Sequence, residues 1–339
     1  MKKYNIAIVG ATGMVGTEML KILEQRKFPV NALRLLASGR SKDRILKFGN
    51  DQIKVENLSQ ASFKGVDIIL SSAGAAISKE FAHLAVKDGA IIIDNTSAFR
   101  MDKDVPLVVP EVNPQMIDTH QGIIANPNCS TIQLVTALWP LHLKAKIIRM
   151  VISTYQAVSG WGKAAVDELK QQTENFLSQK QINVNKNILP HQIAFNLIAQ
   201  IDDFQDNGYT KEEMKLVNET RKIMQVPSLK ITATAVRVPV FISHSESVNI
   251  QTEKALTPSQ AREILGKAKG VKVVDDIADR EYPLPIQAAG TDDVCVGRIR
   301  KDESIPNGLN LWIVSDNLRK GAALNAIQIA EHLMQGKNY

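Results

Sequence analysis

Cys129 is the side chain of this sequence best suited to nucleophilic chemistry. It lies in the string NPNCST (residues 126–131), between a short apolar run that ends at residue 125 and a run with helical spacing. The N-terminus of a helix lowers the pKa of a thiol, because unpaired N–H groups and the helix dipole favour the thiolate. Asparagine and serine neighbours can donate hydrogen bonds to a developing oxyanion. We therefore predict that Cys129 is a nucleophile rather than the buried structural residue that a free cysteine often is.

A nucleophilic cysteine usually works with a base, and six histidines could supply it. His244 lies in the string RVPVFISHSE (residues 237–246), where a strand-like run enters polar residues. We therefore expect it in a polar turn, and a lone histidine in a turn is more often a surface residue than a catalytic one. Cys295, in the strand-like string DVCVG (residues 293–297), is predicted to be a core residue.

A glycine-rich loop near the start of the chain is typical of a dinucleotide site. The string GATGMVG (residues 10–16) lies between an apolar run, YNIAIV (residues 4–9), and a predicted helix that begins at residue 13. Glycines there permit a tight turn and a close approach to a pyrophosphate, which the helix N-terminus faces with unpaired N–H groups. The spacing is GxxGxxG rather than the commoner GxGxxG, and a tight turn without a ligand is the alternative. The expected cofactor contacts are Gly10, Thr12, Gly13, Met14, Val15 and Gly16.

The end of the second predicted strand, at residues 32–37, indicates which dinucleotide binds. An NAD site usually has an Asp or Glu about 20 residues after the glycine loop, to hold the ribose 2′-OH. Here no acid stands at the end of the strand, and Ser38, Arg40 and Ser41 offer two hydroxyls and a guanidinium. These groups suit a 2′-phosphate. The sequence therefore predicts NADP rather than NAD, and an ordinary polar turn is the alternative.

A scaffold must position these residues, and the first third of the chain alternates strand-like with helix-like segments. This alternation implies βαβ units and a mostly parallel sheet. The middle of the chain is richer in strands and predicts an antiparallel sheet, and a helix over 317–335 closes the chain. The early strands are expected at 4–9, 32–37, 67–70, 90–93 and 122–125, with helices over 13–25 and 77–87 and a hairpin within 47–58. The later strands are expected at 147–158, 231–242, 247–252 and 309–315, with a helix over 161–177.

Composition excludes several classes of protein. The chain has 339 residues, of which 44% are hydrophobic and 22% charged, and this suits a globular protein of about two domains. Two cysteines rule out a disulfide-rich secreted scaffold and a four-cysteine zinc site, and we expect no metal. The net charge of +6 comes without a Lys/Arg-rich block, so nucleic acid is not an expected partner. The sequence shows neither a signal peptide nor an apolar run of transmembrane length, which predicts a cytoplasmic protein with no membrane partner.

Taken in order along the chain, these motifs resemble those of the bacterial type of aspartate-β-semialdehyde dehydrogenase. The strings that carry the resemblance are GATGMVG (10–16), SSAG (71–74), DNTSAFRM (94–101), PEVN (110–113), NPNCST (126–131), TYQAVSG (154–160), ETRKI (219–223), RVPVFISHSE (237–246) and DNLRKGAALNAIQIAE (316–331). The resemblance implies an α/β fold with a Rossmann-type NADP-binding domain over residues 1–129, completed by a C-terminal helix at 317–339. It also implies an α+β catalytic and dimerisation domain of semialdehyde dehydrogenase type over 130–316, in a homodimer or a tetramer.

The reaction implied by this resemblance is a reductive dephosphorylation in the biosynthesis of lysine (through diaminopimelate), methionine, threonine and isoleucine. L-aspartyl 4-phosphate and NADPH become L-aspartate 4-semialdehyde, NADP and phosphate. By the same resemblance, Cys129 attacks the acyl phosphate, and hydride from NADPH reduces the resulting thioacyl enzyme. A thiolate is a strong nucleophile, and covalent capture divides one difficult step into two easier ones. His244 matches the general acid/base of the family, and Gln156 matches the residue that positions the reacting groups.

Further side chains match the family's contacts with substrate and cofactor. By the resemblance, Arg237 grips the substrate carboxylate, a bidentate task that suits a guanidinium, and Glu219 pairs with the ammonium. Glu219 and Lys222 are three residues apart in a helical stretch and therefore face one side. The phosphate site implied by the resemblance consists of Arg100, Asn128 and Lys222. The further cofactor contacts are Ser71, Gly74, Asn95, Ser159, Gly160, Gly162 and Asn317.

One position departs from the family pattern, and two other functions compete with this interpretation. Trp161 stands where a small residue is expected, which leaves the geometry of Ser159 and Gly162 open. An N-acetyl-γ-glutamyl-phosphate reductase would use similar chemistry, but its acylated substrate nitrogen carries no charge for Glu219 to pair. A non-enzymatic NADP-binding regulator would have no need of the complete set of catalytic residues.

Overall fold

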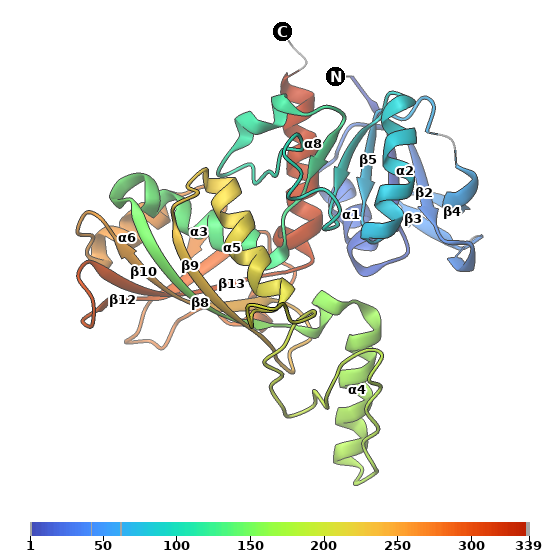
Figure 1. The fold of residues 1–339 in the computed structure, drawn as a ribbon. Coiled ribbons are helices and arrows are strands. Elements are labelled where there is room, and N and C mark those ends of the chain that lie inside the picture. The colour runs from blue at the N-terminus through green and yellow to red at the C-terminus, as the bar shows by residue number, and fades with distance from the viewer. Residues whose placement is uncertain (1, 42, 62, 337–339) are drawn as a thin grey trace. The chain divides into compact units, whose positions relative to one another are not determined.

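The computed structural model describes residues 2–41, 43–61 and 63–336, which fold into two compact units (Figure 1). The first unit contains the described residues up to Asn128 and those from Ala322 onward, and the second runs from Cys129 to Gly321. The chain therefore leaves the first unit just before Cys129 and returns to it near the C-terminus. In the part of the chain that the structure describes, no helix has both the length and the apolar composition of a membrane span.

The first unit is built on a seven-stranded sheet with the order β3-β4-β2-β1-β5-β6-β7. Every neighbouring pair is parallel except the β3–β4 hairpin, so the predicted parallel sheet is confirmed. The hairpin expected within 47–58 also forms, and β4 joins the sheet by pairing in parallel with β2. The strands are β1 (Tyr4–Val9), β2 (Val30–Ala37), β3 (Ile45–Phe48), β4 (Asp51–Asn57), β5 (Ile68–Ser71), β6 (Ile91–Asp94) and β7 (Ile123–Ala125).

Helices cover both faces of this sheet. Ile8 of β1 packs with α1 and α8, whereas Val9 on the opposite face packs with α2. A strand that is covered on both faces is apolar along most of its length, which explains the run YNIAIV. The helix predicted over 317–335 begins as a π-helix, η5 (Arg319–Ala323), and only then becomes α-helical. The helices are α1 (Met14–Gln25), α2 (Ala75–Lys87) and α8 (Leu324–Gly336), with short 3₁₀ helices η1 (Gly39–Ser41), η2 (Leu58–Gln60) and η3 (Pro114–Thr119).

The second unit is built on a six-stranded sheet with the order β11-β12-β13-β10-β8-β9. β10 pairs antiparallel with β8 and β13, which confirms the antiparallel pairing predicted for the middle of the chain. β9 was also predicted to pair antiparallel, and this was wrong, because it pairs in parallel with β8. The strand predicted over 231–242 ends at Arg237, because Pro239 cannot continue a ladder, and the next strand begins at His244. The strands are β8 (Ile147–Gln156), β9 (Lys230–Arg237), β10 (His244–Thr252), β11 (Val271–Val273), β12 (Val294–Asp302) and β13 (Gly308–Ser315).

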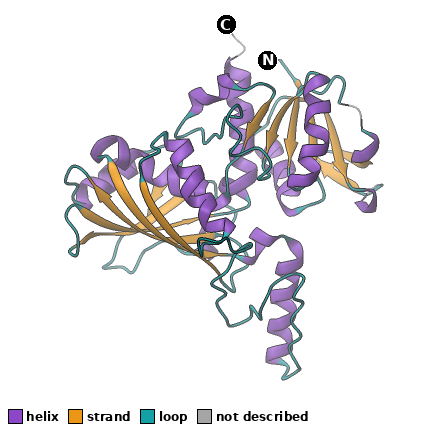
Figure 2. Ribbon diagram, in the orientation of Figure 1, coloured by secondary structure: helices purple, strands orange, loops and turns teal. Residues whose placement is uncertain are grey.

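Helices α3, α5 and α6 lie on one face of the second sheet, and α4 extends away from it (Figure 2). His244 and Glu246 of β10 point to the same side, because side chains alternate along a strand, and Gln133 of α3 lies near Glu246. Cys295 on β12, predicted as a core residue, is only partly buried. The helices are α3 (Cys129–Ala145), α4 (Lys163–Leu177), α5 (Lys211–Met224), α6 (Pro258–Gly266) and α7 (Pro285–Ala288), with a 3₁₀ helix η4 (Val158–Trp161).

Candidate active site

Cys129 is the first residue of α3, as the sequence predicts, and its side chain is partly exposed. Gly321 packs against it so closely that a Cβ atom on Gly321 would lie 3.0 Å from the Cβ of Cys129. A larger residue at position 321 would therefore press on the thiol-bearing carbon. The next residue along α3, Ser130, accepts a hydrogen bond of 2.9 Å at Oγ from Nε2 of Gln156. Gln156 is thereby tied to the first turn of the helix that carries the thiol.

Gln156 and Arg237 end two neighbouring parallel strands and lie opposite each other in the register of β8 and β9. The amide nitrogen of Gln156 also donates to Oε1 of Glu212 at 3.2 Å and to Oγ1 of Thr154 at 3.4 Å. Arg237 is 3% exposed and donates from Nη1 to the carbonyl oxygen of Ala157 at 2.8 Å. Burial lowers the pKa of Arg237, while the negative charges of Glu212 and of the Cys129 thiolate oppose that change. Two predicted site residues are thus brought together by strand pairing.

His244 is the first residue of β10 and is fully buried, so the predicted polar turn is wrong. The reason is that its strand lies between β8 and β13, where polar residues are enclosed by neighbouring strands and helices. Nδ1 accepts a hydrogen bond of 3.0 Å from the backbone N–H of Ala157, so the proton of the neutral ring sits on Nε2. Burial and the charge of Arg237 lower the pKa of His244 to about 3, and Glu212 offsets part of this change. Within the described residues Nε2 has no hydrogen-bond partner.

Gly160 packs closely against both of these side chains. A Cβ atom on Gly160 would lie 2.9 Å from Nη1 of Arg237 and 3.2 Å from Nε2 of His244. Gly160 is predicted to contact the cofactor, and its neighbours in the structure are the predicted acid/base and the predicted carboxylate clamp. Because glycine has no side chain, the imidazole and the guanidinium can both lie against the backbone at this point.

Helix α5 supplies acidic and basic side chains from one face. Glu219 is buried and Lys222 partly buried, one turn apart as predicted. The sequence analysis missed Glu212, which is 5% exposed, hydrogen-bonded to Gln156 and ion-paired with Lys215 at 3.0 Å. A signal was present, because Glu212 precedes Glu219 by seven residues, two helical turns, and so shares its face. Helix α5 therefore brings the buried carboxylate of Glu212 to Gln156.

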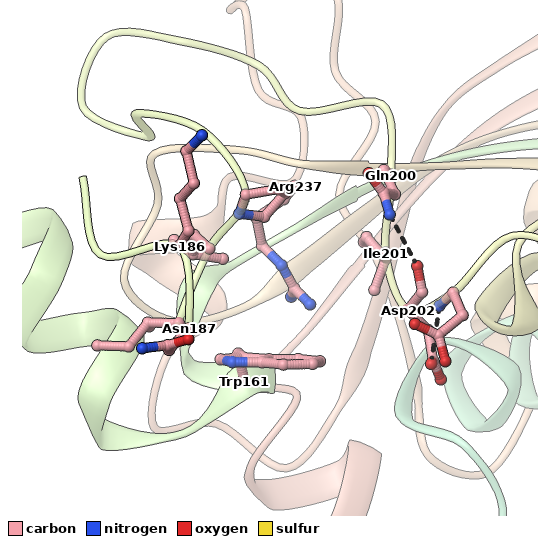
Figure 3. Close-up of a pocket in the computed structure, with 11 residues that line it drawn as sticks. Trp161, Lys186, Asn187, Gln200, Ile201, Asp202 and Arg237 are labelled. Atoms are coloured by element: carbon pink, nitrogen blue, oxygen red, sulfur yellow. Dashed lines mark hydrogen bonds between the residues drawn. The ribbon is translucent and has the colours of Figure 1, made fainter.

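Trp161, the residue that departs from the family pattern, lines a pocket beside Arg237. The indole is 48% exposed at the end of η4, and the pocket has a volume of about 160 Å³. Figure 3 shows the guanidinium of Arg237 pointing toward the indole of Trp161, with Asp202 to one side. The other lining residues are Lys186, Asn187, Ile188, Leu189, Pro190, Gln200, Ile201 and Asp203. The bulky side chain therefore forms a wall next to Arg237 instead of lying away from it.

Ser159 and Asn317, both predicted to contact the cofactor, are hydrogen-bonded to each other. Nδ2 of Asn317 donates to Oγ of Ser159 at 3.0 Å, and its Oδ1 accepts from the backbone N–H of Ser243 at 2.8 Å. Ser243 immediately precedes His244, so Asn317 helps to fix the start of β10. Gly162 immediately precedes α4 and has a φ of +93°, a conformation that favours glycine.

The glycine loop of the first unit combines a positive φ, close backbone packing and an uncapped helix N-terminus. Gly10 has φ of +83°, and a Cβ atom there would lie 2.9 Å from Oγ of Ser72. A Cβ on Gly16 would lie 2.2 Å from the carbonyl oxygen of Gly10. Gly13 precedes α1, whose first turn includes Met14 and Val15, and no side chain caps this helix. The loop therefore leaves backbone N–H groups at a helix N-terminus for an anion, and its residues fit a dinucleotide.

The segment predicted to bind the 2′-phosphate lies next to this loop. Oγ1 of Thr12 donates to Oγ of Ser41 at 3.2 Å, which joins the loop to the turn after β2. The backbone N–H of Ser41 donates to the carbonyl of Ser38, and Ser38 and Arg40 are exposed. The structure thus brings the predicted pyrophosphate and 2′-phosphate residues to one end of β1 and β2.

Other predicted site residues of the first unit form hydrogen bonds within the protein. Oγ of Ser71 lies 3.0 Å from Oγ of Ser78, inside a buried network, so its hydroxyl is directed into the fold. The guanidinium of Arg100 donates to the carbonyl oxygens of Asn95 at 2.9 Å and Asn126 at 3.0 Å. These contacts cluster Arg100 and Asn95 near the ends of β6 and β7. Asn128 is buried at the end of the same unit, and Gly74 precedes α2 with φ of +97°.

Among the described residues, no three His, Cys, Asp or Glu side chains are grouped as a metal site would require. Cys129, Gln156, Glu219, Lys222, Arg237 and His244 all belong to the second unit, and Arg100, Asn128 and the glycine loop to the first. The second unit alone therefore combines a thiol, an amide, an imidazole, a guanidinium and carboxylates.

Comparisons with known proteins agree with this chemistry. Residues 5–120 match the family described as "Semialdehyde dehydrogenase, NAD binding domain", which indicates a nicotinamide cofactor. Residues 138–320 match "Semialdehyde dehydrogenase, dimerisation domain", which indicates self-association. The chain is 54% identical over 335 residues to the aspartate-semialdehyde dehydrogenase of Aquifex aeolicus (strain VF5), with 98% of each chain covered.

Two solved structures extend the comparison. The crystal structure of aspartate semialdehyde dehydrogenase II from Vibrio cholerae complexed with ASA has a TM-score of 0.96 and 46% identity, over 99% of each chain. The crystal structure of aspartate semialdehyde dehydrogenase with NADP from Candida albicans has a TM-score of 0.75 and 25% identity. It covers 98% of this chain and 99% of that chain.

Proposed function

This chain belongs to the aspartate-semialdehyde dehydrogenase family, and on that basis we propose that it converts L-aspartyl 4-phosphate and NADPH into L-aspartate 4-semialdehyde, NADP and phosphate. It is an oxidoreductase of amino-acid biosynthesis in the aspartate pathway. The observation that carries the detailed proposal is the position of Cys129 at the N-terminus of α3, in one unit with Gln156, Arg237 and His244.

Cys129 is the proposed nucleophile. Its sulfur attacks the acyl carbon, so that a C–S bond forms, the C–O bond to phosphate breaks, and phosphate leaves with the bonding electrons. NADPH, when bound, supplies the hydride that reduces the thioacyl carbon. Collapse of the resulting thiohemiacetal breaks the C–S bond, releases the aldehyde and returns the thiolate. Cys129 is partly exposed, as the approach of a substrate requires.

His244, which matches the general acid/base of the family, is proposed to act in its neutral form as a hydrogen-bond donor to the reacting oxygen. Because Nδ1 accepts from the N–H of Ala157, the ring presents its proton at Nε2. A neutral ring can donate that hydrogen bond to the oxygen of the acyl group as negative charge develops there. The lowered pKa keeps the ring neutral at neutral pH, and protonation of Nδ1 would set two N–H groups against each other.

The remaining charged residues are proposed to recognise the substrate. Arg237 binds the carboxylate, because its guanidinium is buried and held by Ala157. Glu219 binds the ammonium group, and Lys222 binds the phosphate together with Arg100 and Asn128. The anionic carboxylate and phosphate of the substrate thus have cationic partners, and its ammonium group has an anionic one.

NADP is proposed as the dinucleotide, held by the residues predicted for it. The hydrogen bond between Thr12 and Ser41 supports this proposal, because it places two hydroxyl-bearing turns side by side. Exposed Arg40 in the same turn has a guanidinium for a 2′-phosphate. The predicted contacts that remain part of this proposal are Ser71, Gly74, Asn95, Ser159, Gly160, Gly162 and Asn317.

The competing functions are not favoured. Relatives and solved structures that cover nearly the whole chain carry the aspartate-semialdehyde name rather than that of an N-acetyl-γ-glutamyl-phosphate reductase. A protein that only binds NADP would have no use for the arrangement of thiol, amide and imidazole.

Self-association is proposed to take the form of a homodimer or tetramer, with the domain at 130–316 supplying the contacts. Residues 1–129 with 317–339 are proposed as the NADP-binding domain, and the cytoplasm as the location. These assignments follow from the family membership.

The proposed reaction can be measured in reverse. The purified chain is mixed with L-aspartate 4-semialdehyde, NADP and phosphate, and the absorbance of NADPH is followed. We expect turnover that depends on all three reagents. Turnover without phosphate would contradict the acyl-phosphate product, and activity confined to N-acetyl-glutamate semialdehyde would favour the competing enzyme.

A further inference from the structure

We propose that Trp161 is a substrate-binding residue, whose indole shields the ion pair between Arg237 and the substrate carboxylate from water. This role rests on the proposed function, which assigns that carboxylate to Arg237. Trp161 is the last residue of η4 and lines the pocket of about 160 Å³ beside Arg237. In Figure 3 the guanidinium points toward the indole, so a carboxylate bound at the tip of Arg237 lies next to Trp161.

The backbone that carries Trp161 is anchored to the fold. The N–H groups of Val158 and Ser159 donate to the carbonyl oxygens of Val240 and Phe241, at 2.9 and 3.2 Å. These two hydrogen bonds join η4 to the segment that precedes β10. The indole therefore leaves from a fixed turn of helix.

Trp161 stands at the boundary between this pocket and solvent. Leu189 and Ile201, which line the same pocket, are each 5% exposed, and Arg237 is 3% exposed. The backbone groups of Arg237 and Ile198 exchange hydrogen bonds of 2.8 and 3.0 Å, which tie the chain before Ile201 to β9. Among the described lining residues, Trp161 alone is a large hydrophobic side chain that is exposed. Its indole therefore covers a buried cation from the solvent side.

The charge of Arg237 is left for a ligand. Its Nη1 donates to a neutral carbonyl oxygen. The two acids that line the pocket have lysine partners, because Asp202 is paired with Lys215 at 2.9 Å and Asp203 with Lys211 at 2.6 Å. The pocket thus presents a guanidinium, while its carboxylates are already matched by ammonium groups.

An apolar wall strengthens an ion pair at this point. Water and salt ions screen exposed charges, and they screen buried charges much less. The Coulomb energy of a pair also grows as the effective dielectric constant falls. The pocket volume of about 160 Å³ is well below the roughly 300–1,000 Å³ of sites for drug-sized ligands, and it suits a small group such as a carboxylate. Trp161 therefore strengthens binding of the substrate rather than the chemical step.

The first test compares Trp161→Ala and Trp161→Phe with the wild-type chain in the reverse assay, at saturating NADP and phosphate. We expect Trp161→Ala to raise KM for aspartate semialdehyde roughly 5- to 10-fold, while kcat changes far less, because the ion pair loses its cover. Trp161→Phe retains an aromatic wall of smaller area and should raise KM less. Between about 50 and 500 mM potassium chloride, KM should rise more steeply in Trp161→Ala than in the wild type.

Binding can also be measured without turnover. Titration with aspartate semialdehyde in the absence of NADP should change the tryptophan fluorescence of the wild-type chain, because the bound carboxylate lies beside an indole. Trp161→Phe should lose this change. Trp139→Phe is the matched control and should keep it, because Trp139 lies toward the far end of α3 from Cys129 and stacks on His142.

The outcomes separate this proposal from the proposed function. Absence of turnover by the wild-type chain contradicts the reaction itself, and the fluorescence titration then decides the role of Trp161 alone. With turnover present, an unchanged KM in Trp161→Ala, or an equal salt dependence in both proteins, overturns the shielding role. A loss confined to kcat overturns it as well, since the indole would then act on the reacting groups. If circular dichroism shows that Trp161→Ala does not fold, the KM and salt dependence of Trp161→Phe decide the question.

Discussion

The Nδ1 atom of His244 accepts a hydrogen bond of 3.0 Å from the backbone N–H of Ala157. The carbonyl oxygen of Ala157 in turn accepts a hydrogen bond of 2.8 Å from Nη1 of Arg237. One backbone position thus orients both the proposed acid and the proposed carboxylate clamp. Because these partners are backbone groups, they cannot rotate away as a side chain could, and the two side chains are preorganised for the reaction.

Buried His244 should make stability depend on pH. Its pKa in the folded state is about 3, below the ordinary 6.5, so the unfolded chain binds more protons between these values. The stability contributed by the neutral ring is complete above pH 6.5 and is lost as the pH falls toward 3. His244→Asn cannot titrate and should reduce this loss by up to about 1.4 kcal/mol per pH unit. Urea unfolding of both proteins across this range is the measurement, and parallel curves would contradict a buried neutral ring.

Glu246→Gln should stabilise the protein at alkaline pH. Neither carboxyl oxygen of Glu246 has a hydrogen bond of ordinary geometry within the described residues, and burial raises its pKa well above the usual value. The nearby amide of Gln133 offsets only part of this rise. Because the pKa is raised in the folded state, the protonated carboxyl makes its full contribution to the stability of the protein at low pH. This contribution is lost as the pH rises through the folded-state pKa. The gain in free energy of unfolding should be about 1–3 kcal/mol at high pH and near zero at low pH. A gain that is independent of pH would count against this explanation.

Gly160→Ala should impair catalysis more than folding. The added methyl group would lie 2.9 Å from Nη1 of Arg237 and 3.2 Å from Nε2 of His244, where neither side chain can easily yield. We expect kcat/KM to fall by about 10-fold or more, since small misplacements of catalytic groups are costly. Gly266→Ala is the matched control, because a Cβ there meets nothing within 4 Å. Equal activity of the two variants would show that the close packing at Gly160 does not position Arg237 and His244 for the reaction.

Cys129→Ser should abolish turnover while NADP binding survives. A serine hydroxyl is far less nucleophilic than a thiolate at neutral pH, so no acyl enzyme forms. The cofactor residues of the first unit are untouched by the change. Cys295→Ser serves as the control, because Cys295 lies on β12 and is not a predicted site residue. Steady-state assays and titration with NADP give both readouts, and near-wild-type activity of Cys129→Ser would exclude the thioacyl mechanism.

Arg40→Ala should reduce the preference for NADPH over NADH. The guanidinium lies in the exposed turn η1, joined to the glycine loop through Ser41 and Thr12. Loss of a charge-assisted bond to the 2′-phosphate should lower kcat/KM for NADPH by about 10-fold and leave the value for NADH unchanged. A wild-type preference for NADH would refute the assignment of Arg40 altogether.

Elements that depend on local chain chemistry could be predicted. The run from Tyr4 to Val9 forms a strand with the expected bounds, and the loop after it has the positive φ that Gly10 permits. The start of a helix at Cys129 was also predictable from spacing. His244 was misplaced because a polar string normally indicates a turn, whereas here neighbouring strands and helices enclose it.

The sequence by itself determined the glycine loop, the cysteine at a helix start and the family. These features lie within short strings, and their chemistry depends on residues next to one another in the chain. Only the tertiary structure decided that Glu212 faces Gln156, and that Ala157 holds both His244 and Arg237. These hydrogen bonds join residues 56 to 87 positions apart. Strand register and helix packing set such contacts, and no local periodicity encodes them.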